Sequence, residues 1–263
     1  MVKAPAASRA RQVSRPQPAG RTIGKRISST ASSLRGPIDD VGVQRIYHVT
    51  HVDNLASILE SGNIYADLSE SWGARPTVDI SSPEAREARR AIAVTDEVDT
   101  TVASYVPFAL SPKSSLWESV VVGAGDPRLS ASVARAAASD FVMLVSTVKQ
   151  VIDLHAGTED SARASIVASD RDAAHPLATF AATRAPVERM LRKLRADTDG
   201  DSILNAELLV EDSFPIELLT LIGVANDRSR DAVKSILADA QYRTKVAVYP
   251  PWFRPAEEDA AAE

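Results

Sequence analysis

At 263 residues, of which 44% are hydrophobic, the chain is long enough to bury one substantial core, and we expect one folded domain plus a tail. The absence of cysteine excludes a disulfide framework, a thiolate metal site and cysteine nucleophilic catalysis, and with only four histidines we expect no metal site. No run approaches the roughly 18 apolar residues of a membrane span, and the N-terminus lacks a secretory signal, so we expect a cytoplasmic protein without membrane contact.

Charge is distributed unevenly along the chain. Residues 1–36 carry eight basic side chains and no acidic one, which leaves 22 basic and 35 acidic residues elsewhere, a net charge of −13 for the remainder. Such an acidic folded part does not indicate nucleic-acid binding by bulk charge. A polynucleotide would have to bind in a local cleft, with or without help from the basic segment.

The two ends of the chain have the composition of disordered segments. Residues 1–43 are rich in Ala, Ser, Pro and Arg and contain almost no large apolar side chain, so we expect a disordered basic tail. This tail either contacts phosphates or is simply solvated, and we favour solvation. Residues 255–263 read as an acidic, frayed end, which leaves residues 44–254 as the folded domain.

Helical and strand patterns alternate irregularly in the first part of the folded domain. A strand over residues 44–49 is followed by a helix over 53–62, in which Leu55, Ile58 and Leu59 share one face and Gly62 is a natural stop. A second helix covers residues 81–91, with Ser82 as a plausible cap. Runs of β-branched and aromatic residues then predict three strands, over 103–110, 119–122 and 141–148.

The same irregular alternation continues to the end of the domain. Residues 186–195 form an amphipathic helix with one apolar and one basic side. The predicted elements after it are a strand over 207–210, a helical turn over 215–219, a strand over 221–225, a helix over 229–240 and a strand over 245–249. Strands interrupted by short helices without regular alternation favour an α+β fold over a doubly wound sheet.

Three segments contain candidate chemistry. His48 and Thr50 lie at a strand end ahead of a helix, where they can offer hydrogen bonds to a flat amide ring, although a histidine there is more often structural. Glu207 lies in an otherwise apolar strand, so it either faces water at a strand end or is held in a pocket. Three arginines, at positions 86, 89 and 90, mark the helix over 81–91, and a solvated helix face explains any one of them.

Taken in order, these segments resemble the DarT family of DNA ADP-ribosyltransferases. The family's opening motif is similar to residues 47–62, YHVTHVDNLASILESG, and its arginine-bearing helix to residues 81–90, SSPEAREARR. Its catalytic-glutamate segment is similar to residues 205–219, NAELLVEDSFPIELL, and its closing strand to residues 246–253, VAVYPPWF. A stretch with Val-Pro-Phe at 106–108 matches as well, so the resemblance spans about residues 44–254.

The resemblance implies an ADP-ribosyltransferase-like split central β-sheet with flanking helices, and a site that uses NAD as its substrate. Glu207 and Arg89 match the family's catalytic residues, and Arg89 also falls on its NAD side. The other NAD-binding positions are matched by His48, Thr50, Asn54 and Tyr47. An error of register would promote Arg86 or Arg90 in place of Arg89.

The acceptor side is matched less well. Tyr105, Phe108, Lys113 and Arg171 are candidates to bind nucleic acid, by stacking or by phosphate contact, with core packing or surface solvation as the structural explanation. Ala109 stands where the family usually has an aromatic residue, and Lys113 replaces an arginine. Residues 170–172, Asp-Arg-Asp, replace an Asp-Arg-His triplet.

The implied activity is transfer of ADP-ribose from NAD to a base in single-stranded DNA, as the toxin of a toxin–antitoxin pair with a macrodomain-type antitoxin. In this scheme His48 and Thr50 hold the nicotinamide, and Glu207 stabilises the cationic ribose and removes a proton from the base. Arg89 holds the pyrophosphate or polarises a base carbonyl. The alternatives are the same chemistry on RNA or protein, and a catalytically silent NAD-fold binding module.

Overall fold

The computed structural model describes residue 1 and residues 40–95, 100–156, 164–197, 201–240 and 242–256. The predicted tails therefore lie largely outside the described residues. The folded part begins before the expected residue 44, because Val41 is 5% exposed and packs in the main hydrophobic core. None of the helices in the described ranges combines the length and the apolar character that crossing a bilayer requires.

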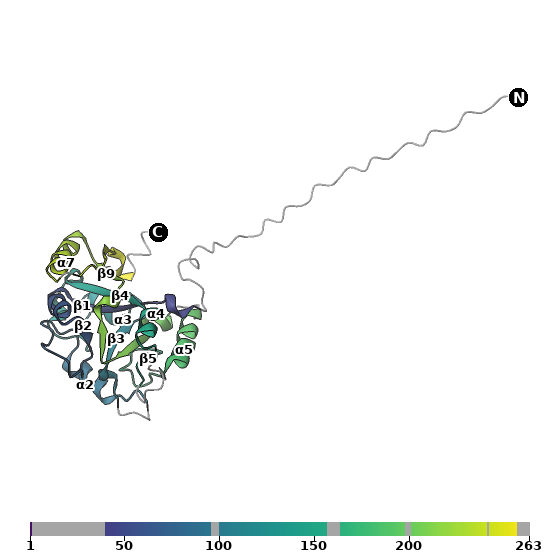
Figure 1. Cartoon of the computed structure of the whole chain (residues 1–263), viewed down its shortest axis with the longest axis horizontal. Helices are drawn as coiled ribbons and strands as arrows, with labels where there is room; N and C mark the ends of the chain where they lie inside the picture. Colours follow the sequence, from purple (N-terminus) through teal and green to yellow (C-terminus); the bar gives the residue numbers. More distant parts are fainter. Residues whose placement is uncertain (2–39, 96–99, 157–163, 198–200, 241, 257–263) are drawn as a thin grey trace. The chain divides into compact units, whose positions relative to one another are not determined.

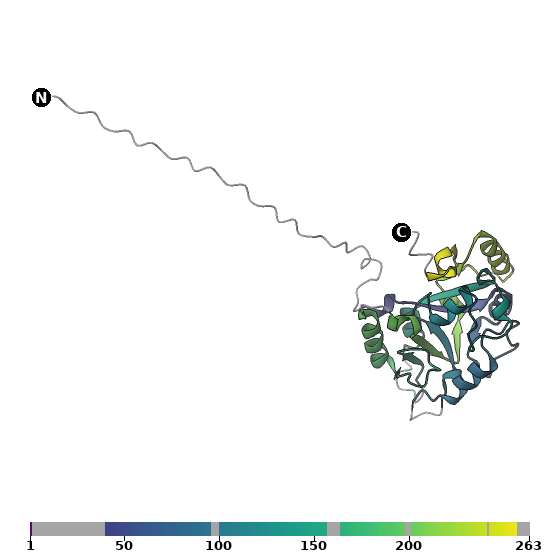
Figure 2. The same ribbon diagram turned by 180° about the vertical axis from the view of Figure 1, so that it is seen from behind.

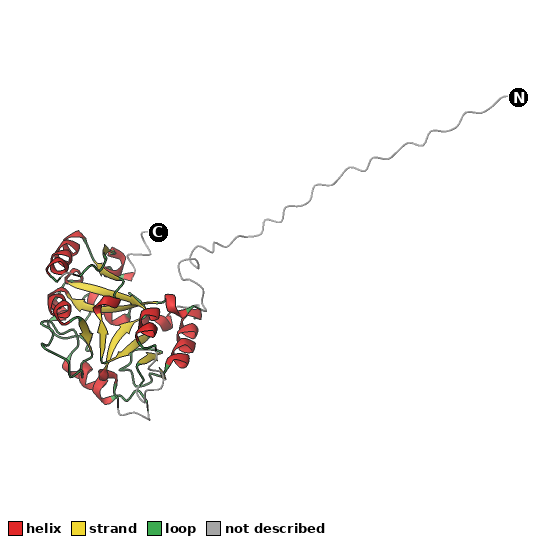
Figure 3. Cartoon of the chain, viewed as in Figure 1, coloured by secondary structure: helices red, strands yellow, loops and turns green. Residues whose placement is uncertain are grey.

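A mixed sheet forms the centre of the domain, and helices surround it (Figures 1 and 3). Its strand order is β10-β9-β4-β1-β3-β7-β5-β6, and a separate two-stranded sheet pairs β2 with β8. Pairing is antiparallel except between β9 and β10. The strands are β1 (Arg45–His51), β2 (Asn63–Tyr65), β3 (Tyr105–Ala109), β4 (Phe141–Thr147), β5 (Ile166–Ser169), β6 (Phe180–Ala182), β7 (Glu207–Glu211), β8 (Ser213–Pro215), β9 (Leu221–Val224) and β10 (Val246–Val248).

The central sheet is nearly divided between β1 and β3. Strand β1 pairs with β4 along its whole length, and β3 pairs with β7 along its whole length. Between β1 and β3, the register consists of Tyr47 opposite Ala109. The architecture is therefore α+β with a split central sheet and flanking helices, as predicted.

The helices lie around this sheet, as both ribbon views show (Figures 1 and 2). They are α1 (Leu55–Ser61), α2 (Pro83–Ala91), α3 (Ser115–Val121), α4 (Val148–Leu154), α5 (Arg184–Ala196), α6 (Asp201–Asn205) and α7 (Asp227–Asp239). Helix α1 ends at Gly62, whose φ of 73° is left-handed and whose amide donates to the Ile58 carbonyl. The predicted helices over 53–62, 81–91, 186–195 and 229–240 are thus present, with ends shifted by a few residues.

The prediction of a strand over residues 119–122 is wrong, because these residues belong largely to helix α3. The Ser114 side chain accepts a hydrogen bond from the Trp117 amide and caps the helix. Trp117 and Val120, which are one helical turn apart, are then buried together. Packing of these two side chains outweighs the preference of consecutive valines for strands.

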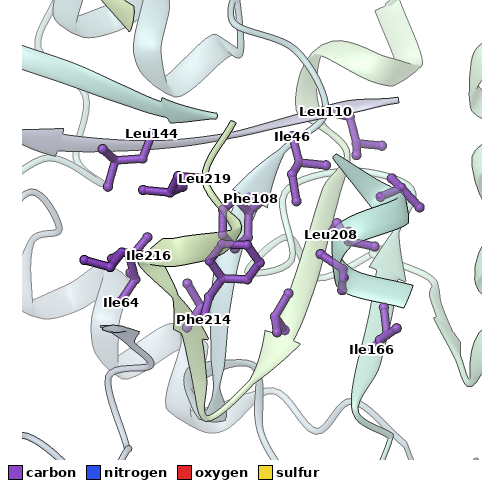
Figure 4. Close-up of a cluster of buried hydrophobic side chains, with 14 of the residues drawn as sticks. Ile46, Ile64, Phe108, Leu110, Leu144, Ile166, Leu208, Phe214, Ile216 and Leu219 are labelled. Carbon is purple, nitrogen blue, oxygen red and sulfur yellow. The ribbon is translucent and has the colours of Figure 1, made fainter. Parts of the chain in front are cut away.

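Side chains from both surfaces of the sheet are buried. The larger cluster contains Ile46, Phe108, Leu208 and Phe214, and the rings of Phe108 and Phe214 lie at its centre with their centroids 4.9 Å apart (Figure 4). The other surface is covered by two smaller clusters, one around Phe141 and Trp117 and one around Tyr105 and Leu209. Strand β4 contributes to both surfaces, which explains its unbroken apolar sequence.

Candidate functional site

A cavity of about 1220 Å³ opens where the central sheet is split. Tyr47 and His48 are consecutive residues of β1 and therefore point to opposite surfaces of the strand, yet both line this cavity. The register places Ala109 beside Tyr47 and Glu207 beside Ala109, so Glu207 lies two strands away from β1 in the same row. Because β1 and β3 separate beyond this row, His48 and Glu207 line one common cavity.

Glu207 is held in this pocket by an arginine. The two terminal nitrogens of Arg89 donate to its carboxylate, Nη1 to Oε1 at 3.3 Å and Nη2 to Oε2 at 2.9 Å. The Ala173 amide donates to Oε1 at 3.4 Å. The side chains of Arg89 and Glu207 are only 18% and 15% exposed, so the sequence alternative of a glutamate facing water at a strand end does not hold.

The charge of Arg89 is stabilised by its surroundings. Burial alone would lower the pKa of the guanidinium, but the neighbouring carboxylates, first of all Glu207, raise it above the ordinary value. Arg89 is therefore charged at all physiological pH values. A bidentate arginine–carboxylate pair of this kind fixes the direction of both side chains.

Local sequence explains how helix α2 places Arg89. Ser82 caps the helix by accepting from the Ala85 amide at 3.1 Å, and Pro83 occupies the first turn. The neighbouring arginines of the helix point elsewhere: Arg86 and Arg90 lie 3.3 Å and 2.7 Å from Asp67. Of the three arginines considered from the sequence, Arg89 is the one that meets Glu207.

His48 is a neutral residue of the cavity wall. Its Nδ1 lies 2.9 Å from the Pro107 carbonyl oxygen. Because a carbonyl can only accept, Nδ1 carries the proton, and the neutral ring then keeps Nε2 as an acceptor. Burial lowers the pKa of His48 below its ordinary value, which favours this neutral form at neutral pH.

The other residues predicted on the NAD side differ in what they offer the cavity. Tyr47 is 8% exposed, borders the cavity, and meets Trp252 edge-on at a centroid distance of 5.4 Å. Burial raises the pKa of the Tyr47 hydroxyl, so it remains protonated at neutral pH. Thr50 is 4% exposed and its hydroxyl accepts from the side-chain amide of Asn54 at 3.2 Å.

Asn54 has a structural role in addition to lining the cavity. Its Nδ2 donates to the Val78 carbonyl at 2.8 Å as well as to Thr50, and its Oδ1 accepts from the Val78 amide at 2.9 Å. These bonds use both amide protons of the side chain. Asn54 therefore holds the segment around Val78 in the cavity wall.

The residues predicted to bind nucleic acid are only partly where that role requires. Phe108 is fully buried in the main core, so its assignment to base stacking is wrong for this structure (Figure 4). The reason is its pleat position, which points the ring away from the cavity and against Phe214. Tyr105 borders the cavity but is 2% exposed.

The two predicted cations also differ. Lys113 donates to the Arg254 carbonyl at 2.7 Å and lies outside the residues that line the cavity, so its position ties the chain's last described turn to the domain. Arg171 lines the cavity with its side chain 42% exposed, 3.2 Å from Asp170. Arg171 is thus the member of the predicted set that can reach a ligand.

Sequence reasoning missed a row of charged residues beside Arg89. Asp172 lies 4.0 Å from Arg89 Nη1 and 2.6 Å from Arg128 Nη1, and Arg128 in turn contacts Asp126 at 2.7 Å. Asp172 and Arg128 line the cavity. The only sequence signal was the departure from the Asp-Arg-His triplet at residue 172, and nothing marked Arg128.

The segment between β2 and α2 forms another wall that was not foreseen. Trp72 lines the cavity, donates its indole N–H to the Ala66 carbonyl at 2.7 Å, and is covered by the Arg75 guanidinium at 5.1 Å. Asp67 in the same segment forms ion pairs with Arg86 and Arg90 of helix α2. The sequence signal for this wall was a loop with aromatic and acidic residues. Such a composition does not tell whether their side chains face a cavity or solvent.

Comparison with known proteins gives a consistent result. Residues 47–254 match the family model described as "ssDNA thymidine ADP-ribosyltransferase, DarT". A DNA ADP-ribosyl transferase of Mycobacterium tuberculosis is 26% identical over 198 residues, which cover 73% of this chain and 81% of that protein.

Solved structures of DarT proteins share the fold. The chain resembles DarT of Thermus sp. 2.9 in complex with ADP-ribosylated ssDNA, with a TM-score of 0.65 and 23% identity over 80% of this chain and 96% of that one. The same Thermus protein in complex with NAD+ gives a TM-score of 0.61 with 22% identity, over 80% of this chain and 98% of that one. Thermosipho africanus DarTG in complex with ADP-ribose gives 0.57 with 16% identity, and the match covers 80% of this chain and 51% of that one.

Proposed function

Because this chain belongs to the DarT family of single-stranded-DNA ADP-ribosyltransferases, we propose that it transfers ADP-ribose from NAD to thymine in single-stranded DNA. The observation that carries the proposal is the Arg89–Glu207 pair in a cavity that His48 also lines. A mere binding module would not require an acid, an arginine and a neutral histidine around one cavity. The family and the cavity volume support NAD as the substrate.

The proposed reaction exchanges one bond at the ribose for another. The bond between the nicotinamide nitrogen and the ribose breaks, and nicotinamide leaves with the bonding electrons. Positive charge on the ribose is stabilised by the Glu207 carboxylate, which keeps acceptor capacity beyond its bonds to Arg89 and Ala173. A thymine ring nitrogen then bonds to the ribose carbon and passes its proton to Glu207.

The wall of β1 would hold the nicotinamide. His48 presents Nε2 as an acceptor, which suits the N–H of a carboxamide, and Thr50 and Tyr47 border the same space. Arg89 orients Glu207 in the structure, and we assign it that role before any contact with pyrophosphate or a base carbonyl.

A single strand is the expected form of the acceptor. The thymine nitrogen that carries a proton is used for pairing in duplex DNA, so the base has to be unpaired to react. Arg171 at the cavity is the cation that we assign to the strand, and Tyr105 borders the space that a base would enter.

The biological role follows from the chemistry. Modification of DNA bases is harmful to a cell, so we propose that the chain is a toxin neutralised by a macrodomain-type antitoxin that removes ADP-ribose. Because both NAD and DNA are intracellular, we propose that the activity is cytoplasmic. The DarTG protein of Thermosipho africanus, of which this chain matches 51%, is consistent with a further domain or partner in such systems.

The test is incubation of the full chain with NAD and short oligonucleotides, followed by mass spectrometry. We expect single-stranded DNA that contains thymine to gain one ADP-ribose, and Glu207→Gln to abolish the gain while NAD still raises the melting temperature of the variant. Labelling of RNA or protein instead of DNA would assign another acceptor. Normal transfer by Glu207→Gln would refute the mechanism, and failure of NAD to stabilise the wild type would favour the silent binding module.

A further inference from the structure

Arg128 lies between two aspartates at the edge of the cavity. Its Nε and Nη2 donate to the two carboxylate oxygens of Asp126, at 3.0 Å and 2.7 Å. Its remaining terminal nitrogen, Nη1, donates to Asp172 at 2.6 Å. These bonds lower the pKa of Asp126 to about 2 and raise that of Arg128, so both groups are charged at neutral pH.

Asp126 therefore fixes the direction of the Arg128 guanidinium. A planar guanidinium bound along one edge by a carboxylate can turn little, because rotation would break both bonds at once. The backbone at this point is anchored too, since the Ser82 amide donates to the Arg128 carbonyl and the Ser82 hydroxyl to the Pro127 carbonyl. Nη1 is thus presented to Asp172 from a rigid support.

Asp172 in turn lies between two arginines, at unequal distances. Its Oδ2 is 2.6 Å from Arg128, whereas its Oδ1 is 4.0 Å from Arg89 and accepts from the Ala174 amide at 2.9 Å. The strong contact is with Arg128, and the contact with Arg89 is at the limit of an ion pair. Both Asp172 and Glu207 are acids within reach of the same Arg89 guanidinium.

Without Arg128, these two carboxylates would compete for Arg89. Asp172 is 22% exposed, and a poorly solvated carboxylate that loses its partner moves toward the next cation. A shift of Arg89 toward Asp172 would weaken its hydrogen bonds to Glu207. Loss of the bond between Arg128 and Asp172 would thus disturb the Arg89–Glu207 pair indirectly, since the Arg128 side chain donates to Asp126 and Asp172.

We propose that Arg128 is a positioning residue, which holds Asp172 and so keeps Arg89 bonded to Glu207. The inference rests on the proposed function, since it assigns the Arg89–Glu207 pair to catalysis. Arg128 acts here through Asp172 and is not itself a catalytic residue. Its side chain can be changed without touching the backbone bonds that anchor residues 127 and 128 to Ser82.

The test compares Arg128→Ala with the double variant Arg128→Ala/Asp172→Asn. We expect the single variant to lower kcat for transfer by on the order of 10²-fold, with little change in the Kd for NAD, because the catalytic pair is misaligned while the cavity persists. The double variant should recover most of the lost kcat, since an uncharged side chain at position 172 no longer draws Arg89 away. Arg128→Lys should have a kcat between those of the wild type and Arg128→Ala, because a single ammonium group cannot form the bidentate bonds that a guanidinium forms with two aspartates.

Arg135→Ala is the matched control, because Arg135 is an exposed arginine near Arg128 in sequence and is not among the residues that line the cavity. It should leave kcat at the wild-type value. A double variant as impaired as Arg128→Ala, or a raised Kd for NAD with normal kcat, would overturn the proposal in favour of a packing or substrate-binding role.

An activity-independent measurement separates this inference from the proposed function. The coupling free energy between Arg89→Ala and Glu207→Gln can be measured by urea unfolding, with and without Arg128. We expect the coupling to fall in the Arg128→Ala background, whereas an unchanged coupling would overturn the inference. If the wild type failed to transfer ADP-ribose, the proposed function would fail, and this coupling would still test the positioning role.

Discussion

His48 lies in the cavity wall, where burial and the Pro107 carbonyl, and no carboxylate among the described residues, set its pKa. Its ring contacts the Pro107 carbonyl and Phe108, whose ring centroid is 5.7 Å away. An uncharged imidazole suits this position, because a charged one would lose solvation without gaining a counter-ion. The same neutral form leaves Nε2 able to accept a hydrogen bond from a carboxamide. Stability and the proposed binding role thus depend on one protonation state.

This protonation state makes stability depend on pH. The pKa of His48 is lowered from 6.5 in the folded protein, so its contribution to stability is fully present above pH 6.5 and decreases as the pH falls below it. We expect the free energy of unfolding to drop more steeply in the wild type than in His48→Gln between about pH 7.5 and about pH 5.5, by at most about 1.4 kcal/mol per pH unit. Urea unfolding at several pH values measures it, and parallel curves for the two proteins would contradict it.

Single residues were predictable from sequence when their neighbours along the chain carried the signal. Glu207 stands out as an acid among leucines, and Arg89 as one of three arginines on a capped helix. The sequence did not say which side chains would surround Glu207 and Arg89. The assignment of Phe108 to stacking failed because the ring is fully buried against Phe214 of β8. The sequence of a pleated strand does not say which of its two surfaces faces the cavity.

At the scale of elements, helix α2 is the clearest link between sequence and site. Its cap, Ser82, accepts from the Ala85 amide and donates to the Pro127 carbonyl, and the residue is 6% exposed. One hydroxyl therefore both starts the helix and joins it to the segment that contains Arg128. Helix α2 itself has no buried residue, so its position depends on such polar contacts.

We expect Ser82→Ala to lower the free energy of unfolding by about 1 to 3 kcal/mol, because it removes the cap and leaves a part-buried carbonyl without its donor. Ser235→Ala provides the control, since Ser235 is exposed within helix α7 and its replacement should change stability by no more than about 0.5 kcal/mol. Chemical denaturation of both variants measures the difference. Equal stabilities of the two would show that the cap is dispensable.

Helix α3 was predicted incorrectly as a strand. Its valines favour a strand locally, whereas the Ser114 cap and the burial of Trp117 favour a helix. The elements β2, β5, β6, β8, α4 and α6 were not predicted, because each is too short for a strand or helix period to stand out in the sequence. The capped or amphipathic helices were predicted, since a cap and a helical period can both be recognised in a sequence of one to three helical turns.

At the scale of the whole domain, its C-terminal turn closes the fold against the sheet. Trp252, in the short helix Pro250–Phe253, stacks on Tyr249 with centroids 4.5 Å apart and meets Tyr47 edge-on. Its carbonyl accepts from the Trp117 indole at 2.6 Å. The Trp252 ring covers Gly223 of β9 so closely that a Cβ there would lie 2.5 Å from it.

Gly223→Ala should therefore destabilise the protein by about 1 to 3 kcal/mol, because the Trp252 ring is confined by Tyr249 and Tyr47 and cannot move aside without cost. Gly73→Ala is the control, since nothing lies within 4 Å of a Cβ at that position. Thermal unfolding compares the two, and an unchanged melting temperature for Gly223→Ala would contradict the close packing.

The sequence by itself indicated the family and the α+β class and marked Glu207 as a candidate acid, because motifs, caps and periodicity are properties of neighbouring residues. It did not determine where the predicted split falls, between β1 and β3, or that His48 and Glu207 line one cavity there. Nor did it determine that Arg89 meets Glu207, 118 positions away, while Arg128 holds Asp172. Such contacts follow from strand register and from the placement of α2 and the loop after β5, and only the folded chain brings these charges within hydrogen-bond distance.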